Sequence, residues 1–504
     1  MISAYTGTQI RGAEKPLLER GMGAVLMQRA AYGLANAVVR ELRASGGRLY
    51  GASATVLAGK GNNGGDGLFA AAMLAGRGMR TTALLTADGA HPAGLAAFHK
   101  AGGRVLRLTP ENVTDASAAA AASDVVIDAV LGTGAQGGLR GPAAALIEAL
   151  GRSRAGLVVA CDIPSGVDAD TGEAHAPVLQ AELTVTFGAA KAGLLADPGA
   201  DFAGRVLVIP IGIDAALPEP ALRRLEAEDL SVLLPRPGRR SHKYSRGVLG
   251  IVAGSSRYPG AAVLACRGAL ASGAGMVRYL GPPDVADLVR RSCPEVVCGS
   301  GSAADTHVQA WLLGPGLDED AHEQLERVRE AAASGLPVVA DAGALPALPR
   351  ALAPHFVLTP HAGELAALLA RYGAEPGRSD VEDATLAAAR RASDLTGATV
   401  LLKGATTLVA APSGAVFSQA EATPWLATAG SGDVLAGVLG SLLAQLAESP
   451  GAFAALGIPA ADRWAGIAAM AASVHGRAGS LASDGAPVRA GGIAGAVPEV
   501  LRTM

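Results

Sequence analysis

Aromatic and charged side chains are scarce in this sequence. Phe, Trp and Tyr make up 3% of the 504 residues, and Asp, Glu, Lys and Arg together make up 17%. With so few large rings, alanine and valine must fill much of any core. The net charge is −3, without the basic excess with which nucleic-acid-binding proteins approach phosphates, so no nucleic-acid partner is expected.

The chain also lacks paired cysteines, membrane-length apolar runs and a secretory signal. Its cysteines, Cys161, Cys266, Cys293 and Cys298, form no CxxC pair and have no histidine cluster at zinc-site spacing. We therefore expect buried or bystander thiols in a reducing compartment. The N-terminus has no basic segment followed by an apolar one, and no apolar run approaches the length that spans a bilayer. These absences predict a cytoplasmic protein without a membrane partner.

A length of 504 residues predicts more than one domain. Helical periodicity covers residues 14–44, and two further helical stretches lie near 431–447 and 461–482. Prolines and charges gather in residues 214–240, which makes this segment the best domain boundary. The 67 glycines fall mostly at the ends of apolar runs, where turns belong.

Short apolar strands alternate with helix-length segments on both sides of that boundary. This alternation predicts mostly parallel sheets covered by helices on both faces. The glycine-rich signatures of the two halves differ, so the sequence predicts two unlike α/β domains rather than a repeat. The expected strands are Ala54–Leu57, Thr82–Leu85, Val105–Leu108, Val125–Val130, Leu157–Cys161, Leu183–Phe187, Val206–Ile209, Val248–Val252, Val277–Leu280, Ala310–Leu313, Val338–Ala340, Phe356–Leu358, Val400–Leu402 and Thr407–Ala411.

Residues 60–67 read Lys-Gly-Asn-Asn-Gly-Gly-Asp-Gly and lie between an expected strand and a helix expected to begin near Leu68. Such a junction directs backbone N–H groups at an anion, and glycines let a phosphate come close. The segment is not a G-x-G-x-x-G fingerprint, so the ordinary dinucleotide interpretation does not transfer. A sharp turn that uses Asn and Gly is the alternative, but this density of Asn, Gly and Asp favours a binding loop.

Two more loops, Asp128–Gly138 and Cys161–Asp168, follow expected strands. Open α/β sheets bind their ligands at the carboxyl ends of strands. The side chains of Asn63, Asp128 and Ser165 could supply oxygens to a monovalent cation. Asp162 is a candidate acid/base, although an isolated aspartate at such a position is as often a cap or turn residue.

Together these three loops resemble the NAD(P)HX epimerase family, the YjeF N-terminal domain, over residues 1–214. The resemblance implies a Rossmann-like three-layer sandwich with Asp162 as the catalytic residue and K⁺ bound by Asn63, Asp128 and Ser165. The substrate contacts that it implies are Asn62, Asn63, Gly64, Gly65, Asp66, Gly132, Thr133, Gly134, Ala135, Gln136, Gly137, Gly138 and Asp162. A structural relative serves as an mRNA-decapping scaffold, so a non-catalytic binding or interaction module stays open for this half.

In the second half, Ala429-Gly430-Ser431-Gly432-Asp433 precedes a helix expected at Val434. Amides at such a helix start can hold a transferring phosphoryl group, and the aspartate can take the proton from an attacking hydroxyl. The alternative is a simple helix cap. Lys403–Thr407 and Thr359–Glu364 follow other expected strands and could meet phosphates or a ribose. There is no Walker A sequence, so this is not a P-loop enzyme.

These motifs resemble the ADP-dependent NAD(P)HX dehydratases of the ribokinase-like superfamily over residues 228–504, with residues 215–240 as linker and start of the domain. The resemblance also rests on His242–Gly247, Gly260–Ala262, Ser272–Gly275 and Gly314–Gly316. It implies nucleotide contacts at Lys403, Gly404, Ala405, Thr406, Thr407, Gly430, Ser431 and Gly432. It implies contacts with the hydrated nicotinamide at Ala262, Gly316, His361 and Asp433, the last being catalytic. Where the family reads Gly-Pro-Gly-Leu-Gly, this chain has Asp318 at the end of the loop.

The two resemblances imply repair of hydrated NADH and NADPH. The first domain would interconvert R- and S-NAD(P)HX with K⁺, and the second would dehydrate the S form with ADP and Mg²⁺, releasing AMP and phosphate. The residues do not decide between ADP and ATP; the family indicates ADP. A homo-oligomer with small-molecule substrates is expected. The alternative is a ribokinase-like kinase of a vitamin-like hydroxyl fused to a non-catalytic ligand-binding domain.

Overall fold

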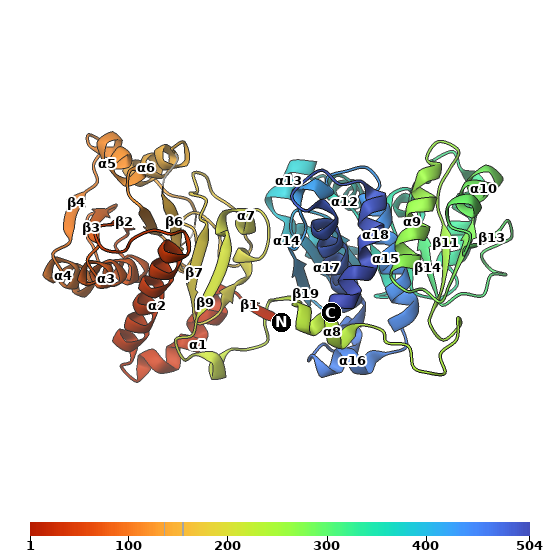
Figure 1. The fold of residues 1–504 in the computed structure, drawn as a ribbon, viewed down its shortest axis with the longest axis horizontal. Coiled ribbons are helices and arrows are strands. Elements are labelled where there is room, and N and C mark those ends of the chain that lie inside the picture. The colour runs from red at the N-terminus through yellow and green to blue at the C-terminus, as the bar shows by residue number, and fades with distance from the viewer. Residues whose placement is uncertain (136, 154–155) are drawn as a thin grey trace. The chain divides into compact units, whose positions relative to one another are not determined.

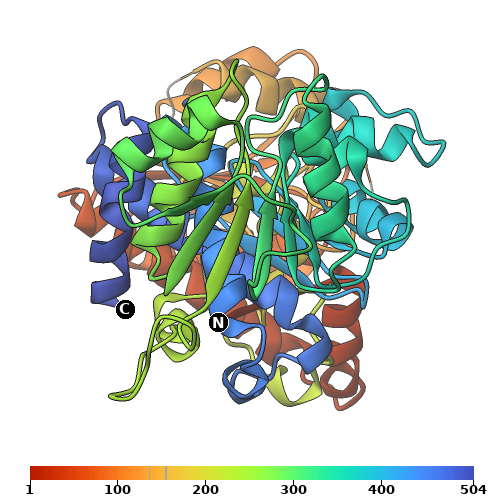
Figure 2. The ribbon, with the colours of Figure 1, turned by 90° about the vertical axis from the view of Figure 1, so that its right-hand side faces the viewer.

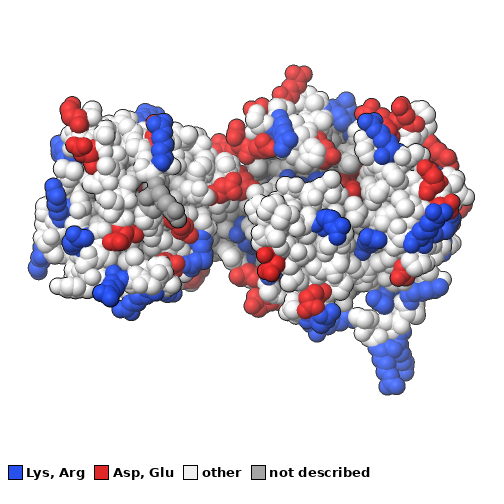
Figure 3. Space-filling model, turned by 45° about the horizontal axis from the view of Figure 1, so that its top comes forward, with Lys and Arg blue, Asp and Glu red and all other residues white. Residues whose placement is uncertain are grey.

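The computed structural model describes residues 1–135, 137–153 and 156–504. These residues form two compact units (Figure 1). One unit comprises Ser3–Leu222, and the other comprises Arg223–Met504 together with Met1–Ile2. Both are α/β units, which confirms the predicted fold class. Most of the face drawn in Figure 3 is uncharged, in keeping with a charged fraction of 17%.

The N-terminal unit is built on a parallel sheet in the order β4-β3-β2-β5-β6-β7-β9. A separate short pairing joins β1 to β8. The strands are β1 (Ile2–Tyr5), β2 (Ser53–Ala58), β3 (Arg80–Leu85), β4 (Arg104–Arg107), β5 (Val125–Ala129), β6 (Leu157–Cys161), β7 (Leu183–Phe187), β8 (Ala190–Lys191) and β9 (Arg205–Ile209). The helices are α1 (Gly7–Glu19), α2 (Gly23–Ala44), α3 (Asn62–Gly76), α4 (Pro92–Lys100), α5 (Val113–Ala121), α6 (Gly141–Gly151) and α7 (Gly199–Ala203), with 3-10 turns η1 (Ala192–Leu194) and η2 (Asp214–Ala216).

Helices cover both faces of this sheet. Val56 and Ile127 point into a core shared with α2, α3 and α4. Their chain neighbours Leu57 and Val126 point into a second core shared with α5 and α6. Because successive strand residues face opposite ways, a sheet buried on both sides needs continuous apolar strands. The predicted three-layer arrangement is confirmed.

Two helix boundaries in this unit differ from the sequence prediction. The expected helical stretch over 14–44 is divided into α1 and α2, because Gly21 adopts a φ of +76° and ends the first helix. The Asn62–Gly67 run, predicted as a loop before a helix near Leu68, instead forms the first turns of α3. A Cβ at Gly64 would lie 2.0 Å from the Gly59 carbonyl oxygen. Gly64 therefore serves close packing of the helix start.

The C-terminal unit has a sheet in the order β13-β12-β11-β14-β15-β16-β17-β18-β19-β10. Its strands are parallel as far as β17, and β18 is antiparallel to both of its neighbours. The strands are β10 (Leu222–Arg224), β11 (Val248–Val252), β12 (Met276–Leu280), β13 (Val297–Gly299), β14 (Ala310–Leu313), β15 (Val338–Ala340), β16 (Phe356–Leu358), β17 (Thr399–Leu402), β18 (Thr407–Ala410) and β19 (Val416–Gln419).

Helices lie on both sides of these strands (Figure 2). One core joins the sheet to α9, α10, α15, α17 and α18, while α11 and α14 contact the sheet outside that core. The helices are α8 (Ala227–Leu233), α9 (Pro259–Ala271), α10 (Pro283–Ser292), α11 (His322–Ala332), α12 (Ala362–Ala370), α13 (Arg378–Asp383), α14 (Thr385–Thr396), α15 (Ser431–Leu446), α16 (Pro450–Ala455), α17 (Arg463–Ser483) and α18 (Ala490–Thr503), with 3-10 turns η3 (Ala342–Ala347), η4 (Pro424–Leu426) and η5 (Ala460–Asp462).

The four cysteines are free thiols, and Cys161, Cys266 and Cys293 are buried, as the sequence predicts. Within the described ranges, no helix combines the length and apolar character needed to cross a membrane.

Glycines inside helices bring α9 and α15 into contact. A Cβ at Gly437 would lie 2.1 Å from the Ala265 carbonyl oxygen, and one at Gly268 would lie 2.4 Å from the Val434 carbonyl oxygen. These positions are not turns, so the expectation that glycines mark the ends of apolar runs is incomplete. Small residues at this contact let two helix backbones approach, which suits a chain with few large side chains.

We expect Gly437→Ala to lower the free energy of unfolding by about 1–3 kcal/mol, because the added methyl group overlaps the α9 backbone. Gly495→Ala is the matched control. Gly495 lies inside α18 with no atom within 4 Å of its Cβ position, so this change should stabilise the protein by about 0.5–1 kcal/mol. Thermal unfolding of both variants measures the difference. Equal midpoints would contradict the close-packing explanation.

Two candidate active sites

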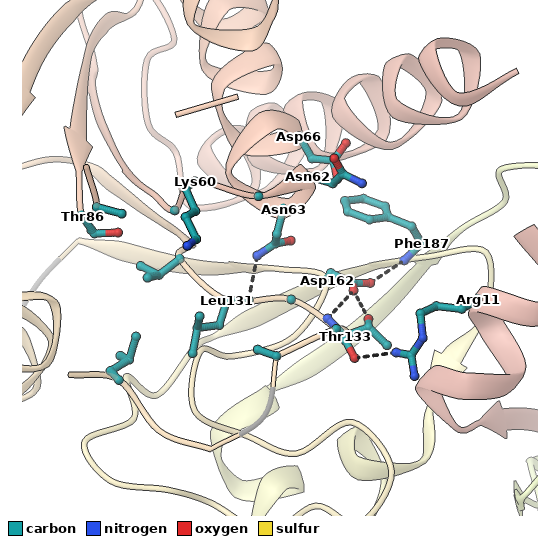
Figure 4. A pocket seen from close by; sticks show the side chains of 18 of the residues that line it. Arg11, Lys60, Asn62, Asn63, Asp66, Thr86, Leu131, Thr133, Asp162 and Phe187 are labelled. Atoms are coloured by element: carbon teal, nitrogen blue, oxygen red, sulfur yellow. Dashed lines mark hydrogen bonds between the residues drawn. The ribbon is translucent and has the colours of Figure 1, made fainter. Parts of the chain in front are cut away.

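A cavity of about 1160 Å³ opens in the N-terminal unit, where β2, β5 and β6 end (Figure 4). The predicted contacts that line it are Asn62, Asn63, Asp66, Gly132, Thr133, Gly134, Ala135, Gly138 and Asp162. Gly64, Gly65 and Gly137 do not line it, and Gln136 lies outside the described residues. The structure thus brings the three predicted loops to one cavity. It assigns Gly64 and Gly65 to the packing of α3 instead.

Asp162 is the most highly bonded side chain of the cavity. It follows β6 directly, is 9% exposed, and has a φ of +67° that is uncommon outside glycine. One carboxylate oxygen accepts hydrogen bonds from the backbone N–H (3.4 Å) and hydroxyl of Thr133. The other accepts from the Lys191 ammonium and, at 3.2 Å, from the Thr186 hydroxyl. The whole residue is therefore fixed in place.

Lys191 decides the protonation state of Asp162. Burial alone would raise the pKa of this carboxyl, but the charge and hydrogen bond of the Lys191 ammonium, with further hydrogen bonds from Thr133 and Phe187, hold the pKa below its ordinary value. Lys191 is 1% exposed and also donates to the Thr186 hydroxyl and the Phe187 carbonyl at 2.9 Å. Asp162 is consequently an ionised carboxylate at neutral pH, suited to accept a proton.

Asp66 and Glu14 line the same cavity, but their pKa values are raised rather than lowered. Burial raises the pKa of Asp66 well above its usual range, and the charges of Asp162 and Glu14 add to the effect. Burial likewise raises the pKa of Glu14. The Oδ1 atom of Asp66 is buried and has no hydrogen-bond partner in the described part of the chain. The cavity therefore holds carboxyl groups whose pKa values are shifted in opposite directions.

The predicted cation ligands also converge. The Asn63 amide nitrogen donates to the Leu131 carbonyl at 2.8 Å, while its Oδ1 atom is buried with no partner among the described residues. Asp128 is 1% exposed and accepts from the backbone N–H of Ser165 at 2.8 Å and from its hydroxyl at 2.6 Å. The Ser165 hydroxyl also accepts from the Leu131 N–H at 2.8 Å. This set of oxygens includes a single carboxylate, which suits a monovalent cation.

In the C-terminal unit, Asp433 lies in the first turn of α15. The helix begins at Ser431 rather than Val434, after Gly430 with a φ of +86°. A side chain at Gly430 would be strained there, and its Cβ would lie 2.3 Å from Leu264. Burial and the charge of Asp341 raise the pKa of Asp433 to about 6, against the opposing effect of Lys403. The site thus places a carboxyl that titrates near neutrality beside the amides of a helix N-terminus.

Lys403 is held beside Asp433 by other carboxylates. Its ammonium lies 2.8 Å from Asp341 Oδ1 and 3.8 Å from Glu364 Oε2. Burial opposes its charge, but Asp341 and Glu364 outweigh burial and raise the pKa of Lys403. Asp341 is 2% exposed and also accepts from the Thr359 hydroxyl at 2.8 Å. Asp341, Thr359 and Lys403 directly follow β15, β16 and β17, so the sheet brings them together.

The remaining predicted contacts of this unit occupy several loops. Gly404 and Ala405 are exposed between β17 and β18, Thr406 is buried, and Thr407 begins β18. Gly432 lies close to Lys403, since a Cβ there would be 3.5 Å from its Nζ atom.

On the predicted nicotinamide side, His361 caps α12 through its Nδ1 atom, which accepts from the backbone N–H groups of Gly363 and Glu364. Gly316 packs against Ala261 next to the buried Ala262. Asp318 lies 4.0 Å from the Arg257 guanidinium, so the extra charge of this loop has an ionic partner.

Lys191 and Asp341 are absent from the sequence predictions. Each nevertheless carries a signal in the sequence. Lys191 is a lone lysine in the apolar run Leu183–Leu195, and a lysine expected to be buried needs an acidic partner. Asp341 directly follows the expected strand Val338–Ala340, at the carboxyl end where ligands gather.

Comparisons with known proteins agree with this arrangement. The family described as YjeF-related protein N-terminus matches residues 23–193, and the family described as NAD(P)H-hydrate dehydratase matches residues 249–491. A bifunctional NAD(P)H-hydrate repair enzyme of Mycobacterium tuberculosis is 44% identical over 88% of this chain and 89% of its own length. Its counterpart from Mycobacterium leprae is 42% identical over 96% of this chain and 95% of its own.

A solved ADP/ATP-dependent NAD(P)H-hydrate dehydratase from Bacillus subtilis, co-crystallised with ATP and Mg²⁺, is 26% identical with a TM-score of 0.48. It covers 56% of this chain and 98% of its own. The family resemblance predicted from the motifs is confirmed by the two family matches and by the mycobacterial relatives, which extend over both halves. The chain belongs to the family of bifunctional NAD(P)H-hydrate repair enzymes.

Proposed function

We propose that this chain returns hydrated NADH and NADPH to use in two reactions. The unit with Asp162 interconverts R- and S-NAD(P)HX, and the unit with Asp433 dehydrates the S form with ADP, releasing AMP and phosphate. We assign the first activity to residues 1–214 and the second to residues 228–504. The observation that carries the proposal is the presence of two separate sites, each of which pairs a buried aspartate with a lysine. A cytoplasmic homo-oligomer remains our expectation.

The dehydratase reaction needs a better leaving group than hydroxide. The C6 hydroxyl of the hydrated ring attacks the terminal phosphoryl of the nucleotide, and Asp433 takes the hydroxyl proton. The backbone amides at Gly430–Gly432 and the Lys403 ammonium stabilise the charge on the phosphoryl oxygens. Loss of phosphate from C6, pushed by the ring nitrogen, and loss of a C5 proton then restore the double bond.

Mg²⁺ would accompany the nucleotide. Among the described residues no group of three or more His, Cys, Asp or Glu side chains could hold a metal ion alone. We therefore expect the phosphate oxygens of the nucleotide to hold most of the ion's coordination, as they often do for Mg²⁺. When bound, the ion would neutralise phosphoryl charge.

In the epimerase site, Asp162 acts as the base because Lys191 keeps it ionised. K⁺ fits the oxygens of Asn63, Asp128 and Ser165, since the buried Asn63 Oδ1 otherwise lacks a partner in the described ranges. The ion would supply positive charge there. The Asn63–Leu131 hydrogen bond then joins the start of α3 to the Gly132–Gly138 loop, so these residues hold the two substrate-binding segments together.

The test of the whole proposal is the recovery of NADH absorbance from a mixture of R- and S-NADHX with Mg²⁺, K⁺ and ADP. We expect both epimers to be recovered, with ATP tested in parallel. Replacing K⁺ by choline should slow recovery of the R fraction and leave the S fraction unchanged. A stable phosphorylated product in place of NADH would instead favour a small-molecule kinase.

Asp162→Asn tests whether the N-terminal unit is catalytic. Since the amide cannot accept the proton, we expect turnover of R-NADHX to fall by about 10²–10⁴-fold, while S-NADHX dehydration keeps its rate. Asp115→Asn is the control, because Asp115 is exposed on α5. Full R-epimer turnover in folded Asp162→Asn would reduce this unit to a binding module.

Asp433 should set the acidic limb of the dehydratase pH profile. A base with a pKa of about 6 in the free enzyme is unprotonated above that pH, so kcat/KM for S-NADHX should rise with pH through 6 and then level off. Asp433→Asn should lower kcat by about 10²–10⁴-fold and abolish this limb, whereas the exposed Asp383→Asn should not. A variant that retained the limb would exclude Asp433 as the titrating base.

A further inference from the structure

We propose that Asp66 is a second catalytic residue of the N-terminal site, which protonates the C6 hydroxyl of the hydrated ring while Asp162 deprotonates the water that enters on the opposite face. This inference rests on the proposed epimerase function. It gives the site an acid and a base on different elements, where the sequence predicts a single acid/base at Asp162 and only substrate binding at Asp66.

The placement of Asp66 suits a proton donor. It lies in the second turn of α3, whereas Asp162 follows β6, and both line the same cavity (Figure 4). Both oxygens of Asp162 have protein partners. Oδ1 of Asp66 is buried and has none among the residues described. A buried polar atom without a hydrogen bond is unfavourable, so a hydroxyl group of the bound substrate is its natural partner.

The surroundings of Asp66 favour its neutral form. Burial is the largest cause of its raised pKa, followed by the charges of Asp162 and Glu14, while Lys191 opposes them. The buried Cys161 thiol, at the end of β6, adds no charge here, because burial and then the charge of Asp66 raise its pKa. The Lys191 ammonium donates to Asp162, to the Thr186 hydroxyl and to the Phe187 carbonyl, so its three protons are engaged away from Asp66. Two carboxyls whose environments push their pKa values apart are the arrangement that acid and base catalysis requires.

The groups around Asp66 come from several elements. Glu14 lies on α1 and Lys191 lies on β8. His91, the N-cap of α4, packs against Gly65, the residue before Asp66. Glu14 is the closest chemical alternative to Asp66, because its pKa is also raised by burial. Any test of the proposal must therefore separate these two carboxyls.

The reaction balances with these two groups and water. Asp66 gives its proton to the C6 hydroxyl, the C6–O bond breaks, and water leaves as the N1 electron pair forms the N1=C6 iminium bond. A water molecule then adds to the other face of C6, the iminium electron pair returns to N1, and Asp162 takes the extra proton. The product is the opposite epimer. Proton return from Asp162 to Asp66 through solvent restores the site, and the reverse reaction exchanges the roles of the two carboxyls.

The experiment uses the full chain without ADP, so that the dehydratase is silent. Purified R-NADHX is incubated in oxygen-18-labelled water, and chromatography with mass spectrometry follows both epimer interconversion and label at C6, above the uncatalysed rate. Wild type should form S-NADHX carrying the label. Asp66→Asn should lower kcat for both processes by about 10²-fold or more, with KM changed by less than about 3-fold. The wild-type kcat/KM should fall at high pH as Asp66 loses its proton, and the variant should lack this fall.

Glu14→Gln separates the two carboxyls. It should lose much less rate than Asp66→Asn and keep the high-pH fall, shifted to lower pH because the Glu14 charge no longer raises the pKa of Asp66. Asp115→Asn, at an exposed position of α5, is the matched control and should keep the wild-type rate and pH profile. ADP-dependent dehydration of S-NADHX by each variant reports that the chain is folded. If Asp66→Asn is insoluble, Asp66→Ala carries the same test without adding a buried amide.

Three results would overturn the assignment while wild type epimerises. They are a full rate in Asp66→Asn, a change confined to KM, or an equal loss in Glu14→Gln. Epimerisation without label at C6 would overturn the iminium route and with it this role of Asp66. Absence of epimerisation by wild type would instead overturn the proposed function itself.

Discussion

Parallel strands share one direction, so the residues that follow them meet at one edge of the sheet. Both sites depend on this constraint. In the N-terminal unit Gly59 and Asp162 follow β2 and β6, and in the C-terminal unit Asp341, Thr359 and Lys403 follow β15, β16 and β17. The shared strand direction thereby brings residues that are far apart in the chain into one site. The layers of helices keep the sheets buried and leave this edge for chemistry.

Within that common geometry, the position of a lysine decides what each carboxyl can do. Lys191 is bonded directly to Asp162 and keeps it ionised in spite of burial. Lys403 is bonded instead to Asp341, so Asp433 experiences the negative charge of Asp341 as well as the positive charge of Lys403. Burial then raises its pKa to about 6. The same residue types thus produce a carboxyl with a lowered pKa in one unit and one with a raised pKa in the other.

Small residues make these placements possible in a chain with few aromatic side chains. Gly64 lets the start of α3 approach the loop after β2, and Gly437 lets α15 approach α9. Both helices carry site residues in their first turns, Asn63 and Asp433 respectively. A methyl group at either glycine would displace the helix that positions the adjacent functional side chain. Packing and catalysis are coupled at these two helix starts.

The sequence by itself determined most of the central strands and the sites' main motifs, whereas the short strands β1, β8, β10, β13 and β19 were not predicted. Short, continuous apolar runs are typical of central strands buried on both faces, so β11 and β14 were predicted with their observed bounds. The motif residues Asp162 and Asp433 stood out because they follow such strands or precede a helix. The helical state of Asn62–Gly67 was not predictable from propensity, since glycine disfavours helix and only packing against Gly59 selects it.

Tertiary structure alone decided which charges meet. Lys191 lies 29 residues from Asp162 in the chain, and Lys403 lies 62 residues from Asp341. The apolar run around Lys191 indicates that this lysine is buried, but no local pattern identifies the partner of either lysine, because an ion pair depends on distance in space and on exclusion of water. The unpartnered Asp66 oxygen likewise becomes visible only when α1, α3 and the ends of the strands enclose it. Residue types follow from the sequence, whereas protonation states follow from burial and neighbouring charge, which folding alone supplies.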